Sequence, residues 1–122
     1  MSKLLKVTLV VHIVLAVGLG LPLLGLPGRF LGWLGWAPVD PLISRMFGAA
    51  LLGLGWLDLR ALRSNSRQAA QAVIEAGILF CGLAAAGMAR NMLGAAWPWY
   101  TWAVLGIYVL LAGLWIVNWL KK

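Results

Sequence analysis

Charged side chains are scarce in this sequence. Only 11% of its 122 residues are Asp, Glu, Lys or Arg, whereas about a quarter of the residues are charged in typical globular proteins. So few charges cannot cover a surface that faces water. The scarcity therefore excludes an ordinary water-soluble domain, and the 63% of residues that are hydrophobic need another solvent.

Residue types that carry catalysis or hold metals are scarce as well. The chain has three acidic residues, one histidine (His12) and one cysteine (Cys81). A lone cysteine forms no internal disulfide, and Cys81 stands at no metal-ligand spacing, so we interpret it as a small packing residue. The sequence has no nucleophile with its base, no glycine-rich phosphate loop and no metal-binding cluster. We therefore predict a protein that is not an enzyme and needs no metal or cofactor.

Long apolar runs are what the sequence has instead. They cover residues 7–26, 42–57, 69–89 and 97–120. A helix needs about 20 apolar residues to cross the roughly 30 Å of hydrocarbon in a bilayer. The runs do not alternate with a period of two, as the strands of a membrane barrel do. We predict an all-α membrane protein with one domain over residues 1–122 and four transmembrane helices, at about 5–26, 41–60, 68–92 and 97–120.

The basic residues follow a pattern that orients these helices. Seven of them fall on one side of a four-helix topology, namely Lys3, Lys6, Arg60, Arg63, Arg67, Lys121 and Lys122, and the other three, Arg29, Arg45 and Arg90, fall on the opposite side. Cytoplasmic loops of membrane proteins are enriched in Lys and Arg. The pattern predicts an antiparallel four-helix bundle in the bacterial inner membrane with both termini in the cytoplasm. The net charge of +7 then reflects topology and contacts with lipid headgroups, and we predict no binding of nucleic acid.

Tryptophans form two groups that agree with this topology, because indole rings prefer the membrane–water interface. We assign Trp33, Trp36, Trp97, Trp99 and Trp102 to the outer interface, and Trp56, Trp115 and Trp119 to the inner one. The segment LPGRFLGWLGWAPVDP joins the first two spans and is rich in Trp and Gly, which predicts a short interfacial helix or turn. Asp40 and Pro41 then suit the N-cap and the first position of the next helix.

Small residues indicate which helix faces are in contact. In lipid, helices associate through close backbone approach at Gly, Ala and Ser. Gly48 and Gly55 share one stripe of the helix over 41–60, and Gly53 lies on the stripe beside it. We predict helix packing through these three glycines, with the helices over 41–60 and 68–92 as the closest pair.

Two ionisable residues lie well inside predicted spans. His12 is about 9 Å and Glu75 about 10 Å from the cytoplasmic ends of their helices. A charge in hydrocarbon costs on the order of 3 kcal/mol, so we predict that His12 and Glu75 meet as an ion pair or as a hydrogen bond that shares a proton. Three interpretations stay open: a proton-responsive or cation-binding site, a structural clasp that fixes helix register, and contact of Glu75 with a partner subunit.

Asp58 lies near the predicted cytoplasmic end of its helix. Cationic side chains of Lys6, Arg63 or Arg67 are within reach of that end. We therefore expect Asp58 to be a solvated interfacial charge.

Arg45 and Arg90 both lie about one turn inside the outer ends of their helices, with no carboxylate at that depth. Two hypotheses account for them. Either both side chains extend to lipid headgroups from the periphery, or both face inward and bind a lipid phosphate or a quinone-like head through forked hydrogen bonds. In the second hypothesis Trp33, Trp36 and Trp97 form the walls of the site.

The segment SRMFGAALLGLGWLDLR, residues 44–60, carries a family resemblance. Arg45, Gly48 and Ala49 form an Arg-x-x-Gly-Ala opening, and residues 52–55 read Leu-Gly-Leu-Gly. The segment resembles the second helix of small bacterial four-helix membrane proteins that are broadly DoxX-like. The resemblance implies the fold and the class of protein, and it implies no activity.

The leading hypothesis for function is a non-enzymatic membrane protein, either an accessory or structural subunit of a larger complex or a self-associating helical bundle. Its partners are membrane lipids and the other members of that assembly. The alternative is a small proton-coupled or cation transporter that uses Glu75 and His12. The chain is similar in size to the small multidrug-resistance transporters, but their essential Glu lies in the first helix, where this chain has His12.

Overall fold

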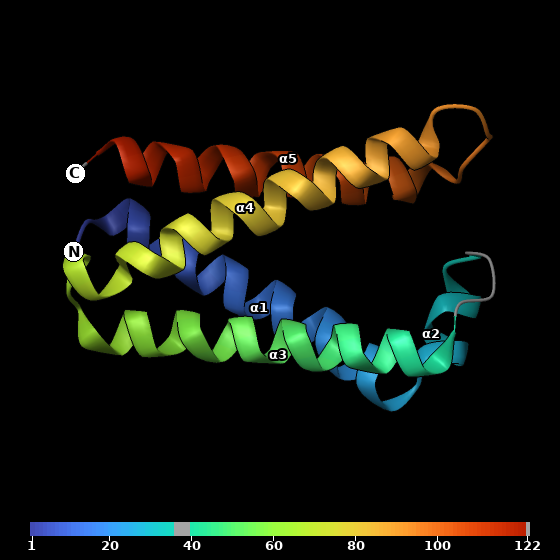
Figure 1. Cartoon of the computed structure of the whole chain (residues 1–122), viewed down its shortest axis with the longest axis horizontal. Helices are drawn as coiled ribbons and strands as arrows, with labels where there is room; N and C mark the ends of the chain where they lie inside the picture. The colour runs from blue at the N-terminus through green and yellow to red at the C-terminus, as the bar shows by residue number, and fades with distance from the viewer. Residues whose placement is uncertain (36–39, 122) are drawn as a thin grey trace. The chain divides into compact units, whose positions relative to one another are not determined.

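The computed structural model describes residues 1–35 and 40–121, and helices dominate them. The five helices are α1 (Lys3–Gly25), α2 (Pro27–Trp33), α3 (Pro41–Ser64), α4 (Arg67–Met92) and α5 (Trp99–Leu120) (Figure 1). The described residues contain no strand. Four of the helices, all except α2, are long and apolar enough to cross a membrane. The predicted all-α chain with four candidate membrane spans is thereby confirmed.

The helix bounds agree with the predicted spans except at the end of α3. The sequence predicts an end near residue 60, whereas α3 continues to Ser64 and only Asn65 and Ser66 separate it from α4. The difference has a physical reason, because basic residues such as Arg63 are favourable near the negative end of a helix dipole and need not mark a loop. In this link Asn65 has a φ of 50°, a left-handed value that Asn tolerates.

The chain forms two compact units. One unit consists of residues 9–64, and the other of residues 1–8 together with the chain from Asn65 onward. The first therefore holds most of α1 with α2 and α3, and the second holds α4 and α5 with the first turns of α1. The single domain expected from the sequence stays a prediction.

In the unit of residues 9–64, α1 and α3 pack through glycine. A Cβ atom on Gly48 would lie 2.7 Å from the carbonyl oxygen of Gly20 and 2.7 Å from the amide nitrogen of Leu24. A Cβ on Gly55 would lie 3.4 Å from the Cβ of Ala16. Residue numbers rise along α1 as they fall along α3, so the two helices run in opposite directions.

Of the three glycines predicted to pack, Gly48 and Gly55 lie in the contact with α1 and Gly53 does not. Gly53 is exposed, and a Cβ built on it meets nothing within 4 Å. The stripe of Gly48 and Gly55 contacts α1. The helices over 41–60 and 68–92 belong to different units, so their predicted pairing stays a prediction. The pattern of small residues marked the contact face correctly because close approach needs Gly, but it carried no information on which helix approaches.

The connection from α1 to α3 contains the short helix that the sequence predicts. α2 begins with Pro27 at its first turn and packs against α3. Leu31 is buried there, whereas Trp33 is 77% exposed. At the start of α3, the amide of Leu42 donates a 2.8 Å hydrogen bond to Oδ1 of Asp40. Asp40 therefore caps α3, as expected.

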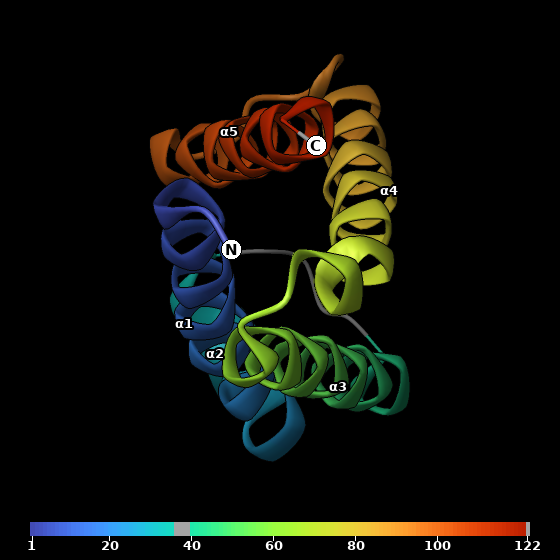
Figure 2. The same cartoon turned by 90° about the vertical axis from the view of Figure 1, so that its left-hand side faces the viewer.

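In the other unit, α4 and α5 lie side by side, as both views show (Figures 1 and 2). Trp115 is fully buried and lies over Gly77, where an added Cβ would stand 2.5 Å from the indole ring. Farther along the same contact, Phe80 and Tyr108 form an edge-to-face pair with ring centroids 6.1 Å apart. An aromatic side chain that fills the space over a glycine therefore sets the distance between the two helices.

Candidate functional site

The unit of residues 9–64 contains a buried pair of ionisable side chains. Nδ1 of His12 on α1 and Oδ2 of Asp58 on α3 form a hydrogen bond of 2.5 Å. His12 is 4% exposed and Asp58 is 1% exposed. Both residues belong to candidate membrane spans. Ionisable side chains inside such spans are rare and commonly functional, which makes this pair the candidate site.

The close packing of α1 against α3 positions the pair. On α1, His12 is followed at helical spacing by Ala16 and Gly20, and all three are buried. On α3, Asp58 is preceded on the same face by Gly55, which contacts Ala16, and by Gly48, which contacts Gly20. Because these contacts keep the two backbones close, the short aspartate side chain reaches the imidazole.

Asp58 corrects an expectation from the sequence. It is not a solvated interfacial charge, because it is buried against His12. The reason lies in the length of α3, which continues six residues beyond Asp58 to Ser64. At a rise of 1.5 Å per residue, Asp58 lies about 9 Å from that end of the helix. His12 lies nine residues after the start of α1, about 14 Å along its axis.

A histidine and a carboxylate in hydrogen-bond contact can hold one proton between them. In surroundings of low dielectric the charged forms interact strongly, so that protonation of one group depends on the state of the other. Removal of either partner would leave the other buried without its counter-charge, which is costly. The pair is thus suited to two tasks, namely joining α1 to α3 and binding a proton.

Glu75, the predicted partner of His12, is exposed on α4. Its Oε1 accepts a 2.9 Å hydrogen bond from Nε2 of Gln71, one turn earlier on the same helix. Since His12 and Glu75 belong to different units, their predicted pairing stays a prediction. What the structure adds is that His12 has a carboxylate partner in its own unit and that Glu75 has an amide partner on its own helix.

A polar network in the second unit was not predicted from the sequence. Nδ2 of Asn118 donates to Oγ1 of Thr8 over 3.0 Å, and both residues are buried. Nη1 of Arg67 donates a 2.6 Å hydrogen bond to the carbonyl oxygen of Asn118. Nε of Arg67 also contacts Oε1 of Gln71 at 3.4 Å, which links the network to Gln71 and Glu75. The sequence contains one sign of this network, namely the polar side chain of Asn118 within an otherwise apolar run.

Arg67 has a clear structural role in this network. α5 ends at Leu120, and the guanidinium of Arg67 donates to two of its last carbonyl groups, those of Asn118 and Trp119. Helix C-termini carry unsatisfied carbonyl oxygens and a partial negative charge. The guanidinium therefore caps α5 and has a function beyond the topological one expected from the sequence.

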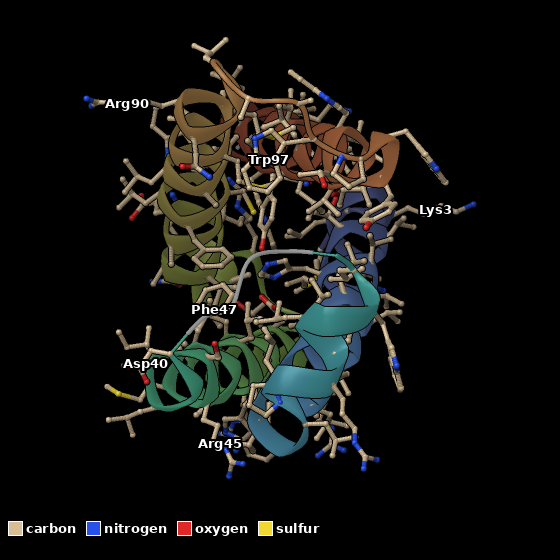
Figure 3. The ribbon with its side chains drawn as sticks, turned by 90° about the vertical axis from the view of Figure 1, so that its right-hand side faces the viewer. Lys3, Asp40, Arg45, Phe47, Arg90 and Trp97 are labelled. Atoms are coloured by element: carbon tan, nitrogen blue, oxygen red, sulfur yellow. The ribbon has the colours of Figure 1, made fainter. Side chains whose placement is uncertain are left out.

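Arg45 and Arg90, the candidate residues for lipid or anion binding, are both exposed. Figure 3 shows the side chain of Arg45 extending away from α3 and that of Arg90 extending away from α4. Each belongs to a different unit, so the inward-facing pair stays a prediction. The outward directions are those that long cationic side chains adopt to reach lipid headgroups.

The tryptophans assigned to the interfaces differ in exposure. Five are on the surface, namely Trp33, Trp56, Trp99, Trp102 and Trp119, while Trp97 is half-buried. Trp115 differs from them, because it is fully buried and lies over Gly77. Trp36 lies outside the described residues.

In residues 1–35 and 40–121, no group of three or more His, Cys, Asp or Glu side chains is arranged to hold a metal ion. Cys81, free and buried on α4, lies in the span as expected for a packing residue. No family model, no curated protein and no solved structure matches the chain significantly.

Proposed function

We propose that the chain is a non-enzymatic integral membrane protein that acts through lateral contacts of its helices in the bilayer. In this proposal it crosses the bacterial inner membrane four times, as an antiparallel bundle with both termini in the cytoplasm. It serves as an accessory subunit of a larger complex or as a self-associating bundle.

The observation that carries the proposal is the apolar outer surface of all four long helices. Val14 on α1, Ile43 on α3, Leu83 on α4 and Leu110 on α5 are each more than 60% exposed. Such side chains suit contact with lipid or with other membrane helices. The links between described helices are short, so the helices supply most of the surface through which this part of the chain can act.

The distribution of basic residues supports the orientation. Arg63 and Arg67 flank the link between α3 and α4, whereas Arg45 and Arg90 lie near the other ends of those helices. An excess of cations marks the cytoplasmic side. On the opposite side, the outward-extending Arg45 and Arg90 are candidates for contact with lipid phosphate.

The mass of the assembly in its own lipid tests the proposal. The chain is expressed at its native level, extracted with surrounding lipid in polymer discs, and measured by native mass spectrometry. We expect a mass that exceeds that of one chain, through copies of this chain or through other proteins. A single chain that carries only lipid would contradict the proposal.

A small proton-coupled or cation transporter is the second candidate, in line with the interpretation that uses His12 and Glu75. The specific observation in its favour is the buried hydrogen bond of His12 with Asp58. If this candidate is correct, chain reconstituted in vesicles carries a cation flux that depends on pH and is lost in Asp58→Asn. Equal flux in vesicles with and without the chain would exclude it.

A further inference from the structure

We propose that Gln71 and Glu75 on α4 form a docking site for a transmembrane helix of another protein, one that carries a Lys or Arg at the same depth. The proposal rests on the proposed function, because it names the chemistry of a lateral partner. Charge complementarity within the bilayer decides the kind of partner.

The carboxylate of Glu75 is exposed and held in place. Nε2 of Gln71 donates to its Oε1 over 2.9 Å. Gln71 is itself oriented, because its Oε1 lies 3.4 Å from Nε of Arg67. Arg67 is anchored by its 2.6 Å hydrogen bond to the carbonyl oxygen of Asn118. The carboxylate is therefore presented on the surface of α4 by a connected series of polar groups.

The depth of Glu75 makes its exposure costly. Glu75 lies eight residues after Arg67, the first residue of α4, so it is about 12 Å along the helix axis. The side chain is too short to reach water from there, unlike that of Lys or Arg near a helix end. A charge in hydrocarbon costs on the order of 3 kcal/mol. The single amide of Gln71 leaves most of the carboxylate's acceptor capacity unused, and a cation from a neighbouring helix would satisfy it.

The surface beyond Glu75 suits a helix. Leu79 and Leu83 follow at intervals of four residues and are 64% and 69% exposed. Gly82 lies beside them, and a Cβ built there meets nothing within 4 Å. We call Gln71, Glu75, Leu79 and Leu83 the α4 stripe. Small residues next to large apolar ones allow a second helix to approach closely.

A second copy of this chain fits the α4 stripe less well than a different protein. Two copies joined through this stripe would bring two Glu75 carboxylates together, and like charges repel. The stripe itself contains no cation that could pair with Glu75 of the other copy. A partner with Lys or Arg at this depth instead gains an ion pair with Glu75 on binding. An apolar helix cannot form this ion pair, so the site favours the cationic partner.

Designed transmembrane helices test the proposal. One synthetic Leu/Ala helix carries a single Lys about two turns from its end, and its matched control carries Leu there. Energy transfer between labelled helix and labelled full chain in phosphatidylcholine vesicles measures association. We expect the Lys helix to bind about tenfold more tightly than the control. Glu75→Gln should abolish the difference, and Glu75→Lys should favour a helix with Asp instead.

A control variant and two further measurements, of oligomeric state and of unfolding free energy, complete the test. Asp40→Asn removes an acid outside this stripe and should leave the preference for the Lys helix unchanged. Equal binding of the Lys and Leu helices would overturn the proposal. So would a homodimer that Glu75→Gln dissociates, because the occupant would then be a second copy. A loss of unfolding free energy in Glu75→Gln as large as in His12→Gln would place the carboxylate against the chain itself and would also overturn it.

The failure of this proposal is distinguishable from the failure of the proposed function. A native assembly whose mass is unchanged by Glu75→Gln retains lateral association and overturns only the docking site. A single chain in native lipid, whatever the designed helices do, overturns the proposed function.

Discussion

His12 and Asp58 are hydrogen-bonded to each other across the contact between α1 and α3, with Nδ1 and Oδ2 2.5 Å apart. Forty-six positions separate the two residues in the chain, so the bond joins distant segments. It lies on the same face as the glycine contacts at Gly48 and Gly55. Polar and close-packed contacts therefore fix the same pairing of helices.

Removal of one member of this pair should destabilise the protein strongly. Asp58→Ala removes the carboxylate that the buried imidazole of His12 contacts, and loss of one member of a buried pair costs about 3–5 kcal/mol. The double variant His12→Ala, Asp58→Ala should lose less than the sum of the single variants, because residues in direct contact couple. Unfolding in mixed micelles with increasing SDS measures these free energies. Strictly additive losses would show that the two groups do not interact.

Gly48 should tolerate no side chain. In Gly48→Ala the new methyl group would lie 2.7 Å from backbone atoms of α1, and backbone cannot move aside cheaply. We expect a loss of about 2 kcal/mol in the free energy of unfolding. Gly53→Ala on the same helix is the matched control. Its methyl group enters open space, and alanine favours a helix more than glycine does. If both variants unfold alike, the contact between α1 and α3 is not as described.

Gly77 offers the corresponding test for α4 and α5. A methyl group in Gly77→Ala would lie 2.5 Å from the indole of Trp115, so the ring must shift. Overpacking of this kind costs about 1–3 kcal/mol. Gly82→Ala lies on the same helix, where an added Cβ meets nothing. Quenching of tryptophan fluorescence should rise in Gly77→Ala and stay unchanged in Gly82→Ala; equal quenching in both would contradict the packing of Trp115.

Much of the helical fold follows from the sequence, since long apolar runs, the cap at Asp40 and the turn signals of residues 26–35 are local properties. The glycine stripe of α3 is also visible in the sequence, because close approach requires residues without a side chain. The helix that covers that stripe is set by tertiary packing, and no local pattern specifies it.

The candidate site was only half predictable. His12 stands out as an ionisable residue in an apolar run, but its partner in the structure is Asp58, which the sequence places near water. The sequence predicts that α3 ends near residue 60, close to Asp58. Because α3 continues to Ser64, Asp58 lies farther from the helix end than predicted. Trp115 shows the same limit, since an indole near the end of a span suits both an interface and a helix contact, and only the facing Gly77 decides.

Thiol labelling from each side of the membrane should reveal the proposed topology. In a Cys81→Ser background, Gln68→Cys near the start of α4 and Ala95→Cys after its end are both on exposed residues. A membrane-impermeant maleimide added to intact cells should modify Ala95→Cys only, because the cation-rich link between α3 and α4 faces the cytoplasm. Gln68→Cys should react after the cells are opened. The reverse pattern would invert the orientation, and labelling of both in intact cells would contradict four crossings.

Photo-cross-linking in living cells tests lateral contact through α4 most directly. A photoreactive phenylalanine derivative replaces Leu79, which is 64% exposed and lies one turn beyond Glu75, and a second variant carries it at Leu110 on α5. The account predicts a discrete protein adduct at position 79 that is lost when Glu75→Gln is added, and a weaker adduct at position 110. Irradiation that yields no protein adduct at position 79, at native expression level, would contradict it.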